Sequence, residues 1–503
     1  MRAQAAYDEL IRRARESSLL DSCATLLAWD EETYMPRAGA AHRGEQQALL
    51  AGLHHERVTH PRISELLAEL EGSALTQDPL SATAVNVREL RRSYNRLTRL
   101  PRRLVEELAR IVSLAQQEWV VAREKATFSR FRPWLEKIIG LKRRQAEAIG
   151  YEDCPYDALL DEYEPDARSR ALAGLFEVLR RELVPLVAAI TYAGRKPDVA
   201  VLHRDYPLER QRQFGEQVAS ALGFDFLGGR LDPTTHPFFA TIGLGDCRIT
   251  TRYSAHCFND GFFGILHEVG HGLYEQGLDA AHHGTPMGEA ASLGLHESQS
   301  RLWENTVGRS HAFWQHFFPR ARRTFGPILE DVALDEFHFA VNHVEASLNR
   351  VQADEVTYNL HILVRFELER ALLDGELKAA DVPDAWNEKS RHYLGVTPEN
   401  DAEGCLQDGH WGAGLVGYFP TYTLGNVYAA QFYARAAEEL GDLDEAFARG
   451  QFGPFLDWLR VKIHRHGSRY RAAELIKHVT GALPDPQPLV KMLQTKYKRL
   501  YRI

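Results

Sequence analysis

Two histidines and a glutamate in the segment His267-Glu268-Val269-Gly270-His271 have the spacing of a metal site. Residues four apart on an α-helix lie on one face, so both imidazoles can reach a single ion. Glu268 lies about 100° around the helix, which places it beside the metal as a base and not as a ligand. The pattern predicts a zinc site at which Glu268 takes a proton from a water molecule that attacks an amide carbon.

A catalytic zinc site also needs a third protein ligand and an open position for water. Glu297 supplies a carboxylate 26 residues after His271. We expect it on a second helix that has Thr285 as its N-cap and Pro286 as its first residue. The alternative is that Glu297 only pairs with Arg301, four residues on, at the surface.

Other histidines near this segment are less suitable as ligands. His296 adjoins Glu297, but neighbouring residues on a helix do not share a face, so we expect His296 to point elsewhere. His282 and His283 precede Gly284 in a predicted loop. Because the chain has 22 histidines, two hydrogen-bonded histidines on an ordinary helix remain the alternative to a metal site.

The elements around the motif are a predicted strand followed by a helix. Apolar and polar residues alternate over residues 246–253, which is strand periodicity. Asn259 and Asp260 then offer N-caps for the helix that carries the motif. Helical periodicity dominates elsewhere, and predicted helices cover residues 1–30, 103–126, 166–191, 208–222, 355–375 and 427–447. Without a repeat or a low-complexity linker, residues 1–503 are expected to form one mainly α unit, with a catalytic core at about 230–430.

Composition and charge exclude several classes of protein. The net charge of −9 argues against a general nucleic-acid binder. The arginine-rich residues 87–104 could contact nucleic acid, but their spacing favours the solvated face of an amphipathic helix. No apolar run is long enough to span a membrane, and the first residues lack the pattern of a secretory signal, so we expect a cytoplasmic protein. Five scattered cysteines predict neither disulfides nor a thiolate zinc site.

Six segments, in order, resemble the motifs of the carboxypeptidase Taq family of metallocarboxypeptidases. Two positions depart from the family pattern: Asn349 stands where Ile or Val is preferred, and Gly412 where Ser is frequent. Neither departure removes a functional group. The six segments are His236-Pro-Phe, Asp246-Cys-Arg248-Ile-Thr250, the HEVGH motif, His296-Glu297-Ser298-Gln299, Arg350-Val-Gln-Ala353-Asp354 and Gly404-Cys-Leu-Gln407-Asp408-Gly-His410-Trp411.

The resemblance implies a fold and an activity. The fold would be a two-lobed helical clam with a deep central groove and a small β-sheet beside the metal site, usually as a homodimer. The activity would be stepwise removal of C-terminal residues from peptides, with broad preference and poor acceptance of proline. Zinc is the expected metal, with cobalt able to substitute, and neither nucleic acid nor a membrane is an expected partner. The alternatives are a clam-shaped oligopeptidase or dipeptidase, or a non-catalytic zinc scaffold.

A carboxypeptidase must recognise a terminal carboxylate, for which the planar fork of an arginine is suited. Arg350 and Arg248 are the candidates, since each lies in one of the family motifs. Arg350 could instead pair with Asp354 on one helix, and Arg248 could brace the wall of the groove.

The developing oxyanion needs a donor besides the metal. His410, Tyr418 and Tyr422 are the candidates, because related clam-shaped peptidases use a histidine and a tyrosine in this region. Gln407 and Asp408 are expected to orient His410 or a ligand imidazole. His236 is expected either to shape the groove or to pack in the core. The preferred C-terminal residue, the substrate length and the choice between the tyrosines stay open.

Overall fold

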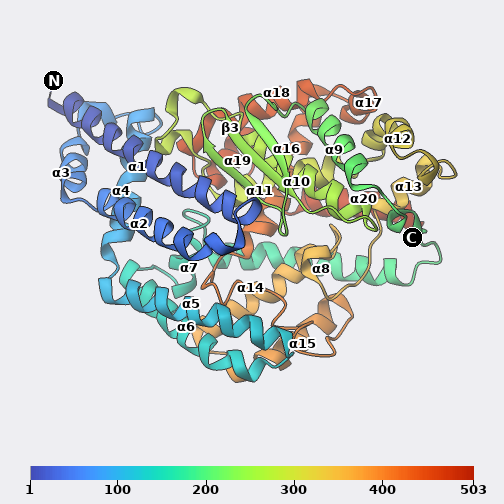
Figure 1. Ribbon diagram of the computed structural model, residues 1–503, viewed down its shortest axis with the longest axis horizontal. Coiled ribbons are helices and arrows are strands. Elements are labelled where there is room, and N and C mark those ends of the chain that lie inside the picture. The colour runs from blue at the N-terminus through green and yellow to red at the C-terminus, as the bar shows by residue number, and fades with distance from the viewer. Residues whose placement is uncertain (1) are drawn as a thin grey trace.

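Helices form most of the chain, as the sequence periodicity predicts. A computed structural model describes residues 2–503 and is 69% helical with one small three-stranded sheet (Figure 1). The helices are α1 (Arg2–Thr33), α2 (Ala40–Val58), α3 (Pro61–Leu70), α4 (Ala82–Arg99), α5 (Arg102–Glu124), α6 (Phe128–Ile149), α7 (Pro155–Leu160), α8 (Ser169–Thr191), α9 (Leu208–Leu222), α10 (Phe258–Glu275), α11 (Leu293–Arg301), α12 (His311–Phe325), α13 (Leu334–Val341), α14 (Tyr358–Asp374), α15 (Val382–Leu394), α16 (Pro420–Leu440), α17 (Leu443–Ala448), α18 (Gly453–Lys462), α19 (Ala472–Thr480) and α20 (Gln487–Tyr501).

The predicted helix over residues 427–447 differs most from the structure. It covers parts of two helices, α16 and α17. Helix α16 begins earlier, at Pro420. Proline suits the first turn of a helix because it lacks the backbone N–H, which would have no partner there. It ends at Leu440, and the next residue, Gly441, has a φ of 87°, in the region that favours glycine. The predicted helix 208–222 has the same bounds as α9, and the other four correspond to α1, α5, α8 and α14 with shifts of one to three residues at one or both ends.

The sheet has the strand order β1 (Gly229–Pro233), β3 (Asp246–Thr251), β2 (Phe239–Gly243). Strand β3 is the predicted strand, and it pairs parallel to β1 and antiparallel to β2. Ile249, Thr250 and Thr251 are all buried, so the alternation in the sequence does not separate a wet face from a dry one. Helix α10 packs against β3 and α1 packs against β2. The sheet therefore stands directly beside the helix that carries the HExxH motif.

Two groups of elements lie on opposite sides of the molecule. Figure 1 shows α5, α6, α14 and α15 on one side, and the sheet with α9, α10 and α12 on the other. Helix α14 packs against α15, α8 and α16, so it joins the two groups. This arrangement confirms the expected two-lobed helical fold with a small sheet.

Helix α4 corrects the interpretation of the arginine-rich segment. Its arginines are not a solvated face, because they bond to neighbouring elements. Arg91 pairs with Glu71 after α3, and Arg92 pairs with Asp161 after α7. Arg88 donates to the backbone carbonyl of Ser468. The guanidinium groups therefore tie α4 to the rest of the fold, where their charges are matched by carboxylates and carbonyls.

All five cysteines are free thiols, in agreement with the expectation of no disulfide framework. Among the described helices, none is both long and apolar enough to cross a membrane.

Candidate metal centre and active site

Helix α10 carries the HExxH motif, with Glu268 and His271 buried and His267 partly buried. The helix begins one residue before the predicted caps, at Phe258, and its N-cap position is Cys257, which makes no side-chain cap bond. Asn259 and Asp260 therefore lie inside the first turn and not at its start. A carboxylate in that turn still suits the positive end of the helix dipole.

Helix α11 carries Glu297 but starts later than predicted. Its N-cap is Ser292, whose hydroxyl accepts a hydrogen bond from the amide of Leu295 at 3.0 Å. Thr285 and Pro286 instead belong to a separate 3₁₀ turn, and the Thr285 hydroxyl donates to the carbonyl of His282. Proline suits a 3₁₀ turn as well as a helix start, so the sequence signal did not separate the two.

A glycine within the HExxH motif lets α10 and α11 cross closely. A Cβ atom at Gly270 would lie 2.4 Å from the carbonyl oxygen of Gln299 and 2.5 Å from the Cα of Ser300. A larger residue would push the two helices apart. The crossing brings Glu297, two residues before Gln299 on α11, over the histidines of α10.

The three predicted ligands converge. Glu297 Oε2 lies 3.6 Å from His267 Nε2 and 3.6 Å from His271 Nε2. One potential ligand atom from each of the three residues lies within 4.8 Å of the others. Two imidazole nitrogens and one carboxylate oxygen form a donor set that zinc commonly has in catalytic sites.

Arg301 pairs with Glu297, but not at the surface. Arg301 Nε donates to Glu297 Oε1 at 2.7 Å, which leaves Oε2 facing the histidines. Both side chains are largely buried. Burial acts to raise the pKa of Glu297, but Arg301 and the two histidines hold that pKa well below its usual range. The expected alternative of a surface pair is wrong, since the ion pair and the approach to the histidines coexist.

Each ligand imidazole is held through its other ring nitrogen. His267 Nδ1 lies 2.9 Å from Glu304 Oε2, and Arg301 Nη1 donates to the same oxygen at 3.2 Å. His271 Nδ1 lies 2.5 Å from His296 Nδ1. Such contacts fix the orientation of a metal-binding ring.

His296 corrects a second expectation. It does not point away from the ligands, because its ring contacts His271 while its Nε2 lies 2.8 Å from Glu275. Phe239 of β2 stacks on both rings, with centroids 4.5 Å away in each case. A residue next to Glu297 can reach this position because α11 crosses α10 at close range. His282 and His283 are not part of the converging group.

Glu268 lies beside the predicted ligands in a dry environment. Its side chain is 5% exposed, and within residues 2–503 its buried Oε2 has no hydrogen-bond partner. Burial raises the pKa of Glu268 to about 7. A buried carboxylate oxygen without a partner is costly unless another group satisfies it. The site therefore fits a metal ion that brings a polar molecule next to Glu268.

His410, Tyr418 and Tyr422 form a second group opposite the ligands. Tyr422 OH lies 3.3 Å from His410 Nε2, and the rings of the two tyrosines are 5.4 Å apart. Burial lowers the pKa of His410 to about 4 and raises that of Tyr422 well above its usual value. The negative charge of Glu297 also acts to raise the pKa of both tyrosines. Near neutral pH, Tyr422 keeps its proton and can donate a hydrogen bond.

Arg350 belongs to a 3₁₀ turn (Arg350–Gln352) and bonds to Asp408. Its Nε and Nη2 donate to Asp408 Oδ1 at 3.0 and 2.7 Å. The alternative pair with Asp354 is wrong, because Asp354 accepts from the backbone amides of Val356 and Thr357 at the turn before α14. An i,i+4 pair needs a continuous helix, and the chain is not helical there.

Asp408 receives a second arginine. Arg365 Nε of α14 donates to Asp408 Oδ2 at 2.6 Å. Burial opposes ionisation, but Arg365 and Arg350 hold the pKa of Asp408 far below its usual range. His410 Nδ1 is 3.9 Å from Asp408, and Gln407 accepts from the amide of Arg350. Gln407 and Asp408 thus contact the Arg350 turn directly and no ligand imidazole.

Arg248 and His236 lie around the sheet. Arg248 donates to both carboxylate oxygens of Asp246 at 2.8 Å and stacks on Trp29 of α1. Its charge is therefore matched, as expected for a residue that braces a wall. His236 is exposed in the β1–β2 connection, so the core-packing alternative is wrong.

Several supporting residues were not identified from the sequence. Glu304 and Arg301 follow Glu297 at positions i+7 and i+4, which share one helix face, so the spacing could have indicated them. A stretch of π-helix, Leu302–Val307, follows α11 and carries Glu304. Arg365 and Glu369 lie four apart on the buried helix α14, where charged residues are unexpected without a polar partner.

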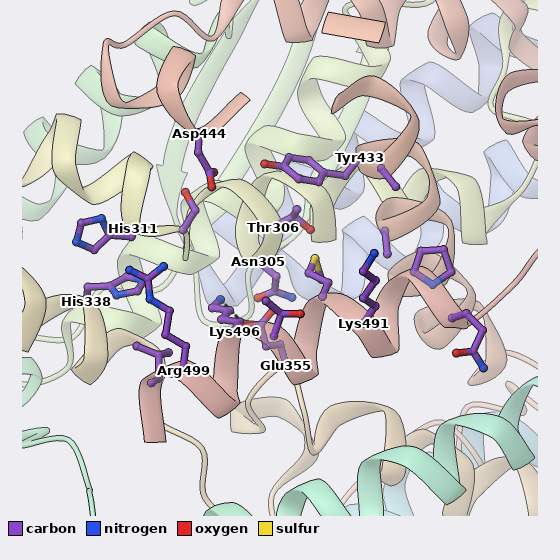
Figure 2. Close-up of a pocket in the computed structure, with 18 of the residues that line it drawn as sticks. Asn305, Thr306, His311, His338, Glu355, Tyr433, Asp444, Lys491, Lys496 and Arg499 are labelled. Carbon is purple, nitrogen blue, oxygen red and sulfur yellow. Dashed lines mark hydrogen bonds and ion pairs between the residues drawn. The ribbon is translucent and has the colours of Figure 1, made fainter. Parts of the chain in front are cut away.

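A large cavity elsewhere does not contain the candidate site. It measures about 990 Å³ and lies among the π-helical segment, α13, α16 and α20 (Figure 2). Figure 2 shows His311, His338 and Arg499 on one side of it and Tyr433 and Lys491 on the other. None of the residues expected at the site lines it. Cavity size alone would therefore have misplaced the site.

Comparisons with known proteins agree with this geometry. Residues 9–497 match the family model described as carboxypeptidase Taq (M32) metallopeptidase. The chain is 53% identical to thermostable carboxypeptidase 1 of Thermus thermophilus over all of both chains, and 38% identical to carboxypeptidase 1 of Bacillus subtilis over 98% of each. An M32 carboxypeptidase structure from Deinococcus radiodurans is 40% identical and superposes with a TM-score of 0.96, covering 99% of this chain and all of that one. This chain therefore belongs to the carboxypeptidase Taq (M32) family of metallopeptidases.

Proposed function

We propose that the protein is a zinc-dependent carboxypeptidase that removes single residues from the C-termini of peptides. We expect a broad residue preference and poor acceptance of proline. Two named relatives are carboxypeptidases. The observation that carries the proposal is the convergence of His267, His271 and Glu297 beside Glu268, whose Oε2 has no partner among the described residues.

The residues divide the chemistry between them. His267, His271 and Glu297 would hold zinc, for which we expect cobalt to substitute. The ion would lower the pKa of a water molecule and polarise the scissile carbonyl. Glu268 would take the proton from the attacking water at Oε2 and pass it to the leaving amine. Burial acts to raise the pKa of this carboxyl, and a buried carboxyl of raised pKa is a better proton acceptor than one in water.

The opposite group would stabilise the charge that develops on the carbonyl oxygen. Tyr422 keeps its phenolic proton and can donate it in a hydrogen bond to the oxyanion. His410 lies against Tyr422 and is neutral, so it can donate without adding a charge. Tyr418 would order Tyr422 through the contact of their rings.

The charge balance near Arg350 supports recognition of a terminal carboxylate. Arg350 and Arg365 both pair with Asp408, and no other carboxylate within residues 2–503 lies within 4.0 Å of either guanidinium. Two buried guanidinium groups therefore share one carboxylate in direct contact, and Glu369, one turn after Arg365 on α14, acts on Arg365 only at longer range. Burying an unpaired charge is costly, and the carboxylate of a peptide C-terminus would offset that cost. An endopeptidase has no need of such a charge.

The remaining residues would support binding. We propose that Arg248 and His236 flank the substrate groove, and that Gln407 and Asp408 hold Arg350 in place. From the family we also expect two lobes and a homodimer. From the sequence pattern we expect a single unit and a cytoplasmic location.

Paired peptides that differ only at the C-terminus test the proposal. A free-acid peptide and its C-terminal amide are incubated with the protein, with and without a chelator, and the products are read by mass spectrometry. We expect stepwise shortening of the free acid, none with chelator, and little action on the amide. Internal cleavage of the amide would instead indicate an oligopeptidase, and metal binding without cleavage would indicate a scaffold.

Arg350→Met sharpens this test. It should reduce the preference for the free acid over the amide by about tenfold or more, because a charged hydrogen bond is worth roughly 1.5–3 kcal/mol. Arg248→Met is the matched control, since Asp246 already compensates its charge. An unchanged preference in Arg350→Met would assign carboxylate recognition to another residue.

A further inference from the structure

The segment that carries His410 and Tyr418 has no regular backbone structure to fix it. Residues 400–419 form turns between α15 and α16, without helix or strand. A few local bonds shape it, such as the amide of Leu415 to the carbonyl of His410. Side chains from other elements must therefore set the position of this segment relative to the metal ligands.

Glu369 of α14 bonds to the segment at two places. Its Oε1 accepts from Trp411 Nε1 at 3.0 Å, and its Oε2 accepts from the amide of Gly417 at 3.1 Å. Trp411 directly follows His410, and Gly417 directly precedes Tyr418. The third donor, Tyr156 OH at 2.9 Å, comes from α7 and not from the segment. One carboxylate thus contacts the neighbour of each catalytic side chain.

The carboxylate has no other evident reason to be there. Glu369 is 0% exposed, and no lysine, arginine or histidine of residues 2–503 forms an ion pair with it. Burial raises its pKa to about 7 against the effect of its three donors and of the Arg365 charge one turn earlier on α14. A buried acid without a cation is costly, so three converging donors mark a position built around an acceptor.

Two further contacts hold the segment close to its neighbours. Gly417 has a φ of 89°, and a Cβ atom there would lie 2.9 Å from the backbone nitrogen of Leu160. One turn earlier on α14, Arg365 bonds to Asp408. Helix α14 therefore holds the segment at residues 408, 411 and 417, on both sides of His410.

We propose that Glu369 is a positioning residue for the reaction, which holds His410 and Tyr418 at the distance from the metal ligands that oxyanion stabilisation requires. The inference rests on the proposed function of His410 and the tyrosines. It predicts that Glu369 acts on turnover and not on substrate affinity, because it contacts neither the peptide nor the ligands.

Glu369→Gln tests the proposal. The amide has the shape of the carboxylate, but its NH₂ group is a donor and cannot accept the bonds from Trp411 or from Gly417 and Tyr156. We expect kcat to fall about 10- to 100-fold, because a displacement of about 1 Å or the loss of a supporting contact commonly lowers activity by that factor. KM and bound metal should change little, whereas the thermal midpoint should fall by a few degrees because buried donors lose their acceptor. In the His410→Ala background the same substitution should lower kcat by less than about threefold, since residues that act through one another are not additive.

Tyr156→Phe is the matched control. It removes one donor to Glu369 without touching the segment, so kcat should stay within about twofold of the wild type. If Glu369→Gln does not fold, Trp411→Phe removes one segment bond alone and should lower kcat with KM unchanged. An unchanged kcat in these variants, or losses that simply multiply in the His410→Ala background, would overturn the proposal. A wild-type protein that fails to shorten free-acid peptides would instead refute the proposed function.

Discussion

The two sides of the candidate active site are built in different ways. The metal side consists of α10 and α11, on which His267, His271 and Glu297 project from regular backbone. The opposite side consists of the irregular residues 400–419 and the first turn of α16. On the helices, spacing determines which side chains share a face, and the close crossing of α10 and α11 at Gly270 determines which of them meet. On the irregular segment, buried contacts to α14 determine where His410 and Tyr418 lie.

The two sides also differ in charge. Glu268, Glu297 and Glu304 gather on the metal side, whereas two arginines share Asp408 on the other. A cluster of carboxylates suits a divalent cation, and an excess of guanidinium suits the terminal carboxylate of a peptide. Under the proposed function, the scissile bond would lie on the metal side and the terminal carboxylate of the peptide on the other.

Replacing the proposed base, on the metal side, should lower kcat more than any other substitution on either side. Glu268→Gln is expected to lower kcat by about 10³-fold, in the range of general base catalysis, while metal binding is retained. Steady-state kinetics and metal analysis of the purified variant measure both. Loss of metal together with activity would show that Glu268 is a ligand, and near-normal turnover would remove it as the base.

Removing a donor on the opposite side should have the next largest effect. Tyr422→Phe is expected to lower kcat by about 10²-fold with little change in KM, because an oxyanion donor acts mainly in the transition state. Tyr418→Phe is the comparison and should have a smaller effect. A larger loss in Tyr418→Phe would exchange the roles that we propose for the two tyrosines.

Glu304→Gln probes the support of a ligand imidazole. It should weaken metal affinity about 10- to 100-fold, since the contact with His267 Nδ1 loses its charge. Competition with a chelator of known affinity measures the change. Glu330 is an exposed acid that follows α12, so Glu330→Gln is the control for the loss of one negative charge and should leave the affinity unchanged. Equal losses in the two variants would mean that the contact with His267 has no special effect.

The smallest expected effect concerns the start of α11. Ser292→Ala should lower the free energy of unfolding by about 1 kcal/mol, because the amide of Leu295 loses its cap. Thermal or urea unfolding measures the change, and turnover should fall only slightly. A loss of metal affinity comparable to that of Glu304→Gln would show that the cap also fixes Glu297.

The sequence indicated the three side chains that converge on the metal side. The histidine pair was found because residues four apart share one face of a helix that repeats every 3.6 residues. Glu297 lies on another helix, and it was found as a carboxylate on the next predicted helix, within a motif that resembles the family. The helix starts were less predictable: Thr285-Pro286 has the signature of a helix start but forms a separate turn. Short capping signals report a local preference, which the crossing of α10 and α11 overrides here.

The sequence by itself determined the helical character of the chain, the strand beside the motif, the candidate ligands and base, and the resemblance to a family. Only the tertiary structure decided that Arg350 pairs with Asp408 and not with Asp354, and that His296 contacts His271. It also decided that Glu369 bonds to Trp411 and Gly417, which adjoin His410 and Tyr418. The reason is physical. Periodicity records which face of one element a residue occupies, whereas these contacts join residues whose elements meet only when buried polar groups find partners across the fold.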